Sequence, residues 1–307
     1  MKKPNFFIIG APKCGTTSLA AWLAEHPTIY MSPVKEPHFF CSDFNVVIIP
    51  NEAEYYRLFK KAGDQHMAVG EASTSYLYSQ VAVPRIEREL PGAKYIVMVR
   101  NPVEMAYSLH DHYIFWGIEH IRDFETAWRL SPERRAGRMV SRWCSEPRLL
   151  DYQSTCKLGE QLERLFSIVP RERVLVLVLD DIKENPRQEY LKVLGFLGVS
   201  DDGRQAFPVK NPAKERRRPK LYKVLRLIGR ASRKTKQLLG IPTNRGTGIL
   251  KAINNINVKY RPRPSMPIQL RKELTEYFRP DIEKLGGLLG RDFSHWLSLP
   301  DEVENDS

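Results

Sequence analysis

A short polar segment near the N-terminus carries residue types that bind phosphate. It reads Pro12-Lys13-Cys14-Gly15-Thr16-Thr17-Ser18 and lies between an apolar run, residues 5–9, and a stretch with apolar side chains at helical spacing, residues 19–23. This pattern predicts a buried strand, a tight loop and a helix start. The first backbone N–H groups of a helix and the positive end of its dipole both favour a bound anion, so the segment predicts a phosphate site.

The loop differs from the loop of P-loop ATPases. Gly10 and Gly15 have the right spacing, but Thr16 stands where the ATPase loop has its lysine, and Lys13 lies inside the loop instead. A nucleotide kinase stays open as an alternative, because Asp180 and Asp181 follow an apolar strand and are suited to bind Mg²⁺. A plain strand-to-helix turn is the structural alternative.

A second polar pair follows another apolar run. Residues 94–99 predict a strand that ends at Arg100, and Asn101-Pro102 predicts a helix start, with the helix reaching about residue 116. Arg100 at the strand end and Ser108 two turns into the helix are placed to meet at one phosphate, since Arg offers a charged fork of donors and Ser a short hydroxyl. Taken alone, Arg100 is equally well explained as a salt-bridge or capping residue.

Together these two motifs resemble the sulfotransferases that use 3′-phosphoadenosine-5′-phosphosulfate (PAPS). The resemblance implies an α/β fold, a P-loop-NTPase-like parallel sheet flanked by helices on both faces. It implies that Arg100 and Ser108 bind the 3′-phosphate. It also implies that the 5′-phosphosulfate is held by the first loop, namely Lys13, Cys14, Gly15, Thr16, Thr17 and Ser18.

Residues 32–40, with the sequence SPVKEPHFF, resemble a segment of the heparan-sulfate and bacterial branch of this family. The glutamate of that segment is the proposed catalytic base, which implies this role for Glu36. Residues 69–76 resemble the segment that lines the acceptor side. Ala72 stands there where several relatives have a lysine, so Glu71 is a second candidate for a base or acceptor contact.

The resemblance also implies a mechanism. Lys13 would neutralise charge on the bridging oxygen as the product 3′-phosphoadenosine-5′-phosphate (PAP) leaves, and no metal would be needed. No His or Cys cluster has the spacing of metal ligands. His38, which precedes two phenylalanines, is expected to be a packed side chain.

The remaining pattern predicts an ordinary parallel sheet. Apolar runs without alternation, separated by helical stretches, indicate strands covered on both faces. The expected strands are residues 5–9, 67–70, 94–99 and 173–179, and the expected helices include residues 52–62, 81–90, 101–116, 160–168, 186–197, 221–239 and 268–285.

The net charge of +12 is concentrated in one late segment. Residues 212–263 hold sixteen Lys and Arg and one acid, which is +15, so the rest of the chain is −3. We therefore expect one domain, residues 1–307, with a basic extension or insertion at about 212–267. Relatives have a basic loop there over the 3′-phosphate, which implies contacts from Arg217 and Arg218. The alternative is a binding module for an anionic membrane surface or an acidic acceptor at residues 214–263; no specific nucleic acid is expected.

The four cysteines form no CxxC pair, no stretch approaches the roughly 18 apolar residues of a membrane span, and the N-terminus shows no cleavage signature. A cytoplasmic protein, peripheral to a membrane at most, is the expectation. The predicted function is transfer of a sulfuryl group to a hydroxyl or amine of a carbohydrate, lipid or small metabolite.

Overall fold

The computed structural model describes residues 2–46, 48–49, 51–210, 214–216, 257–260 and 264–299. At its centre is a five-stranded sheet with the strand order β2-β3-β1-β4-β5, in which every pair is parallel. The strands are β1 (Phe6–Gly10), β2 (Ile29–Met31), β3 (Ala68–Ala72), β4 (Lys94–Val99) and β5 (Val174–Val178). The predicted parallel α/β sheet is confirmed.

The middle strands are apolar because both of their faces are covered. Every residue of β1 and β3 is buried. Gly70 of β3 lies opposite Phe6 of β1, and a Cβ atom at Gly70 would meet the Phe6 ring at 2.4 Å. The glycine therefore gives the aromatic ring its space.

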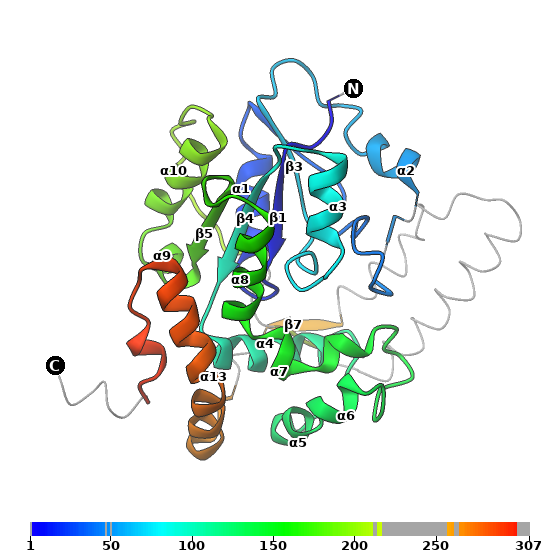
Figure 1. Cartoon of the computed structure of the whole chain (residues 1–307), viewed down its shortest axis with the longest axis vertical. Coiled ribbons are helices and arrows are strands. Elements are labelled where there is room, and N and C mark those ends of the chain that lie inside the picture. The colour runs from blue at the N-terminus through cyan, green and yellow to red at the C-terminus, as the bar shows by residue number, and fades with distance from the viewer. Residues whose placement is uncertain are drawn as a thin grey trace, which may run out of the picture.

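Helices cover both faces of this sheet (Figure 1). On one face α3 and α13 pack against α8, and on the other α1 and α10 are joined through Phe207, whose ring contacts Trp22 of α1 and Tyr190 of α10. The larger helices are α1 (Thr16–Ala24), α3 (Ala82–Glu89), α4 (Pro102–Phe115), α8 (Leu158–Ile168), α10 (Pro186–Leu197) and α13 (Ile268–Leu289).

The carboxyl ends of the strands point toward α4 and the short helices beside it (Figure 1). The short elements are α2 (Glu52–Arg57), α5 (Phe124–Arg129), α6 (Ser131–Arg135), α7 (Tyr152–Thr155), α9 (Leu179–Glu184), and the 3₁₀ turns η1 (Pro147–Leu150), η2 (Arg171–Arg173) and η3 (Ser294–Trp296). Loops at this edge of a parallel sheet are the usual place for a ligand site.

Predicted and observed elements differ where segments are short. Strand β2 has three residues and helix α9 follows β5 without a break, so neither has a periodic pattern of its own. Helix α2 ends at Arg57, five residues before the predicted end. Helix α10 and strand β4 have the predicted bounds.

Much of the basic segment lies outside the described residues, including Arg217, Arg218 and the predicted helix at 221–239. Its flanks are described: β6 (Lys214–Arg216) pairs antiparallel with β7 (Val258–Tyr260), and β6 lies beside α4. The two ends of the segment are thus joined next to α4. Its binding to a membrane surface or an acidic acceptor stays a prediction.

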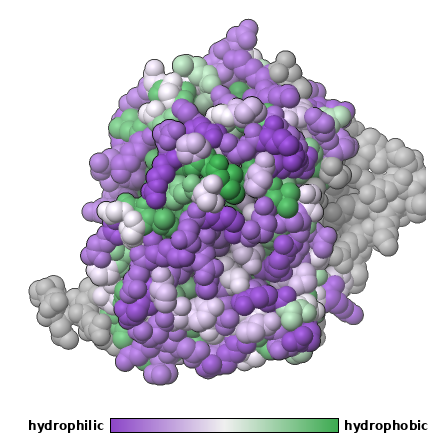
Figure 2. All heavy atoms as spheres, in the orientation of Figure 1, coloured by the Kyte–Doolittle hydropathy of each residue, from purple (hydrophilic) through white to green (hydrophobic). Residues whose placement is uncertain are grey.

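The face shown in Figure 2 is mostly hydrophilic, with hydrophobic atoms gathered in smaller patches. Within the described part of the chain, no helix combines the length and the apolar character needed to cross a membrane.

Candidate active site

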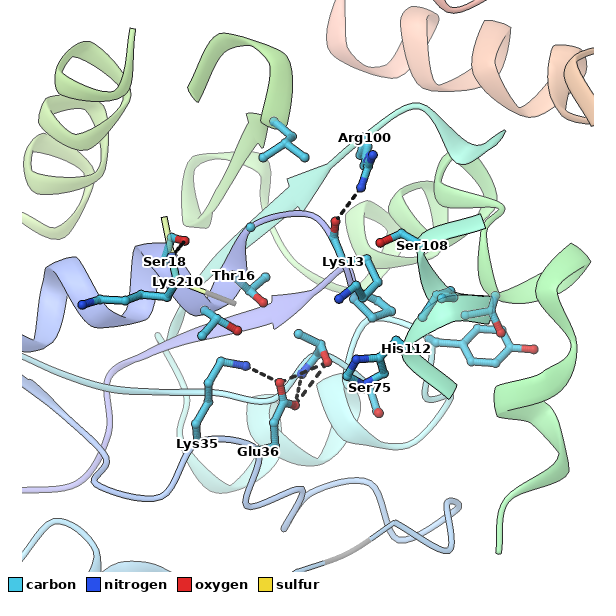
Figure 3. Close-up of a pocket in the computed structure, with 18 of the residues that line it drawn as sticks. Lys13, Thr16, Ser18, Lys35, Glu36, Ser75, Arg100, Ser108, His112 and Lys210 are labelled. Atoms are coloured by element: carbon cyan, nitrogen blue, oxygen red, sulfur yellow. Dashed lines mark hydrogen bonds and ion pairs between the residues drawn. The ribbon is translucent and has the colours of Figure 1, made fainter. Parts of the chain in front are cut away.

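A cavity of about 860 Å³ opens at the carboxyl end of the sheet. Both phosphate motifs and the predicted base line it, although they lie far apart in the sequence (Figure 3). From the first loop come Lys13, Gly15, Thr16, Thr17 and Ser18, from β4 and α4 come Arg100 and Ser108, and from the loop after β2 comes Glu36.

The first loop reaches the cavity through two residues in left-handed backbone conformations. Lys13 has φ 65° and Gly15, the N-cap of α1, has φ 93°. A Cβ atom at Gly15 would meet Leu179 at 3.0 Å and Met98 at 3.2 Å, so glycine suits both the conformation and the close packing. Helix α1 then begins at Thr16 with its N-terminus at the cavity, as the anion site requires.

Cys14 is the one residue of the loop motif that turns away. Its thiol is buried, 3.5 Å from the carbonyl oxygen of Pro12 and 3.9 Å from the Met105 sulfur. Its backbone N–H donates to the carbonyl of Ala11. Burial raises the pKa of this thiol to about 12 despite nearby Arg100 and Lys13. The structure therefore places Cys14 in the core, outside the cavity lining.

Arg100 links the two phosphate motifs. Its guanidinium donates to the carbonyl of Lys13 at 3.3 Å and lies 3.5 Å from Glu104 one turn into α4. Glu104 also pairs with Arg271 of α13 at 2.5 Å. Ser108, one turn after Glu104 on α4, is buried and lines the cavity. These contacts hold Arg100 at the cavity, where the sequence expectation placed it.

Glu36 is held as a carboxylate at the cavity wall. Its Oε2 accepts from the Thr74 N–H at 2.8 Å and lies 3.2 Å from Nε2 of His38, and its Oε1 pairs with Lys35. Burial alone would raise the pKa of Glu36, but the charges of Lys35 and His38 and the hydrogen bonds from Lys35 and Thr74 outweigh it and hold the pKa below its ordinary value. Glu36 is therefore ionised at neutral pH and able to accept a proton.

Glu71, the other candidate base, is enclosed behind the cavity. Its side chain is fully buried and accepts hydrogen bonds from Ser73 at 2.7 Å, Tyr76 at 2.7 Å and Tyr55 at 3.0 Å. Burial raises the pKa of Glu71 to about 7, and these hydrogen bonds limit the rise. The cavity lining does not include Glu71.

Glu71 is linked through its hydrogen-bond donors to the loop that carries Glu36. Ser73 Oγ, which donates to Glu71, accepts from the backbone N–H of His38 at 3.1 Å. Tyr76, the second donor, accepts from the Phe40 N–H at 3.3 Å. This places Glu71 beneath the loop and outside the cavity lining.

His38 is buried, as its two phenylalanine neighbours predict, yet the prediction missed its contact with Glu36. Burial lowers the pKa of His38, and the charge of Glu36 opposes this. The His38 ring lines the cavity and lies next to the Glu36 carboxylate.

The sequence reading also missed one wall of the cavity, residues 207–210. Ser18 Oγ accepts from the Lys210 N–H at 3.0 Å, and Trp22 donates to the Pro208 carbonyl at 3.1 Å. This segment has no regular secondary structure and no motif, so its contacts with α1 and α10, namely these hydrogen bonds and the packing of Phe207, bring it to the site.

The acids that kept the kinase alternative open are engaged elsewhere. Asp180 accepts from the Trp296 indole at 2.9 Å and pairs with Lys183, and Asp181 pairs with Arg291. Within the described residues no three His, Cys, Asp or Glu side chains gather in a way that could hold a metal ion.

The cavity offers two separate anion sites, one at the start of α1 with Lys13 and one at Arg100 and Ser108. This donor set fits a nucleotide with phosphate groups at two positions. The fold and the site thus define a nucleotide-dependent group-transfer protein of the P-loop-like α/β class.

The family described as "Sulfotransferase domain" matches residues 3–210, and the chain belongs to this family. The crystal structure of a sulfotransferase from Alicyclobacillus acidocaldarius is similar over 97% of this chain and 100% of that one, with a TM-score of 0.71 and 28% identity.

Two curated relatives show how broad the similarity is. Carbohydrate sulfotransferase 15 of Mus musculus is 28% identical over 271 residues, which covers 70% of this chain and 48% of that protein. Heparan sulfate glucosamine 3-O-sulfotransferase 6 of Homo sapiens is 25% identical over 304 residues, which covers 94% of this chain and 73% of that protein. The chain spans about half the length of the first of these relatives.

Proposed function

We propose that this protein transfers a sulfuryl group from PAPS to a hydroxyl or amine of a carbohydrate-type acceptor, as a transferase of the EC 2.8.2 type. The observation that carries the proposal is the meeting of two anion sites and an ionised glutamate in one cavity. In Figure 3, Lys13 lies between Arg100 and Glu36. Sulfotransferase relatives with carbohydrate acceptors in their names support the acceptor class.

The first loop and α1 would hold the 5′-phosphosulfate. The backbone N–H groups at the start of α1 and the hydroxyls of Thr16, Thr17 and Ser18 donate hydrogen bonds to it. Arg100 and Ser108 would hold the 3′-phosphate through charge-assisted hydrogen bonds. Contacts from Arg217 and Arg218 stay a prediction.

Glu36 would act on the acceptor. The acceptor oxygen or nitrogen attacks sulfur and its proton passes to the Glu36 carboxylate. The bond between sulfur and the bridging oxygen breaks, and the electron pair leaves with the phosphate of PAP. Lys13 stabilises the negative charge that grows on that oxygen, so positive charge comes from the protein and no metal is needed.

Calorimetry can test the donor half of this proposal. Arg100 and Ser108 contact a group that PAP has and adenosine 5′-phosphate lacks, so PAP should bind at least about ten-fold more tightly. Equal affinities would overturn the assignment of the 3′-phosphate site. Incubation with labelled PAPS and a panel of acceptors tests the transfer itself. The cytoplasmic location stays a prediction.

A further inference from the structure

Many of the residues that line the cavity are apolar or aromatic. Six of them come from four segments outside the first loop and α1, namely Val46, Tyr78, Leu109, Tyr113, Ile118 and Leu149. Leu109 and Tyr113 lie one turn apart on one face of α4, and Ser108 of the same helix also lines the cavity. We call these six residues the apolar wall.

The residues of the apolar wall differ in how deeply they are buried. Leu109 and Tyr113 are almost fully buried, whereas Val46, Ile118 and Leu149 are half-buried. Tyr78 lines the cavity, and its ring meets the ring of Phe44 edge-on with centroids 5.7 Å apart. At the end of α4, Trp116 also lines the cavity with 42% of its surface exposed.

Charge is distributed unevenly between the two halves. Lys13, Arg100, Lys183 and Lys210 line the nucleotide half. Among the described residues around the apolar wall, the charged pair is Lys35 and Glu36, and these two neutralise each other.

We propose that the acceptor is a glycoside with an apolar aglycone, of alkyl or aryl type, that packs on the apolar wall while a sugar hydroxyl lies at Glu36. This inference rests on the proposed function and narrows its acceptor class. The cavity has the volume of a typical small-molecule site, and its mixture of an apolar wall with a few polar groups at one point matches such sites.

The test uses n-alkyl β-glucosides from methyl to octyl, each below its micelle concentration. They are titrated calorimetrically into the protein with saturating PAP and again without PAP. The second titration gives glucoside affinities that do not depend on PAP binding. Each methylene that the wall buries should raise affinity about four-fold, so hexyl should exceed methyl at least ten-fold. In Val46→Asp and Trp116→Ala, affinity should rise less with alkyl chain length than in the wild type. Leu191→Asp, at an exposed apolar residue of α10 outside the cavity lining, should behave as the wild type.

The outcomes separate the two proposals. Equal binding of the methyl and hexyl glucosides, or tighter binding of a polyanionic heparosan oligosaccharide, overturns the apolar acceptor. If PAP still binds far better than adenosine 5′-phosphate, the proposed sulfotransferase function stands in that case. The PAP affinities of the Val46 and Trp116 variants should equal that of the wild type, which shows that they have folded.

Discussion

Replacement of Glu36 by glutamine should slow turnover strongly and leave nucleotide binding unchanged. Glutamine has nearly the shape of glutamate, and its amide oxygen can still accept from the Thr74 N–H, which lies 2.8 Å from Oε2 in the wild type. The amide cannot take a proton at any pH in the working range. It also leaves Lys35 without its paired charge, although Lys35 is partly exposed and water can replace the partner.

The expected loss follows from the role. Removal of a general base typically costs about 10²–10⁴-fold in rate, so kcat of Glu36→Gln should fall in that range. PAP affinity should hardly change, because the proposed nucleotide contacts come from the first loop, Arg100 and Ser108 and not from Glu36. Steady-state sulfation with labelled PAPS and calorimetry with PAP measure the two quantities.

The pH profile gives a second measurement. Because the pKa of Glu36 lies below its ordinary value of 4.5, the base is fully ionised at neutral pH. Wild-type activity should therefore lose its Glu36 contribution only as the pH falls below about 4.5, and the Glu36→Gln profile should lack this acid limb. The exposed Glu172→Gln serves as a control for a lost carboxylate and should behave as wild type.

Near-normal turnover of Glu36→Gln would refute the assignment. If Glu71→Gln is then inactive with PAP binding intact, the base is Glu71, despite its enclosure by Ser73, Tyr76 and Tyr55. If both variants are active, the acceptor needs no protein base, as for an amine that is already nucleophilic.

Other changes have equally definite outcomes. Arg100→Ala should weaken PAP binding by about 1.5–3 kcal/mol in calorimetry, whereas Arg88→Ala, whose side chain is 72% exposed on α3, should not; unchanged binding would remove Arg100 from the site. Lys13→Ala should lower kcat more than PAP affinity, because the charge it neutralises grows as the bridging bond breaks; an effect on affinity alone would contradict this role. Sulfation should survive EDTA, and a loss restored by Mg²⁺ would contradict the metal-free mechanism. Glu71 keeps its proton in the folded protein up to about pH 7 but loses it near 4.5 when unfolded, so its contribution to the free energy of unfolding is full below pH 4.5 and falls by about 3 kcal/mol as the pH rises to 7. Urea denaturation of Glu71→Gln should show a flatter pH dependence in this range, and an unchanged slope would contradict the raised pKa.

The meeting of the two phosphate-type motifs at one cavity could be predicted from the sequence because their signals are local. A buried strand, a glycine loop and a helix start all lie within residues 6–24, and Arg100 directly follows β4. Parallel strands place their carboxyl ends at one edge, so two such motifs must meet if both strands belong to one sheet. The bounds of β4 and α10 were predictable for the same reason, since each has a clear apolar pattern between turn residues.

The acceptor half depended on contacts between distant segments. Glu36 and Glu71 are both loop or strand-end acids in sequence, and only the packed structure puts Glu71 under Tyr55 and Tyr76 and leaves Glu36 at the cavity. Cys14 lies within the loop motif, yet its thiol turns into the core.

The same holds for the cavity walls. Residues 207–210 reach the site through hydrogen bonds to α1, and the apolar wall gathers side chains from positions 46 to 149. Periodicity along a chain records which face of an element is buried, but it does not record which other element covers that face. The sequence by itself therefore determined which two motifs of anion-binding residue types line the cavity, whereas tertiary packing decided which acid lies at the cavity and which apolar side chains surround it.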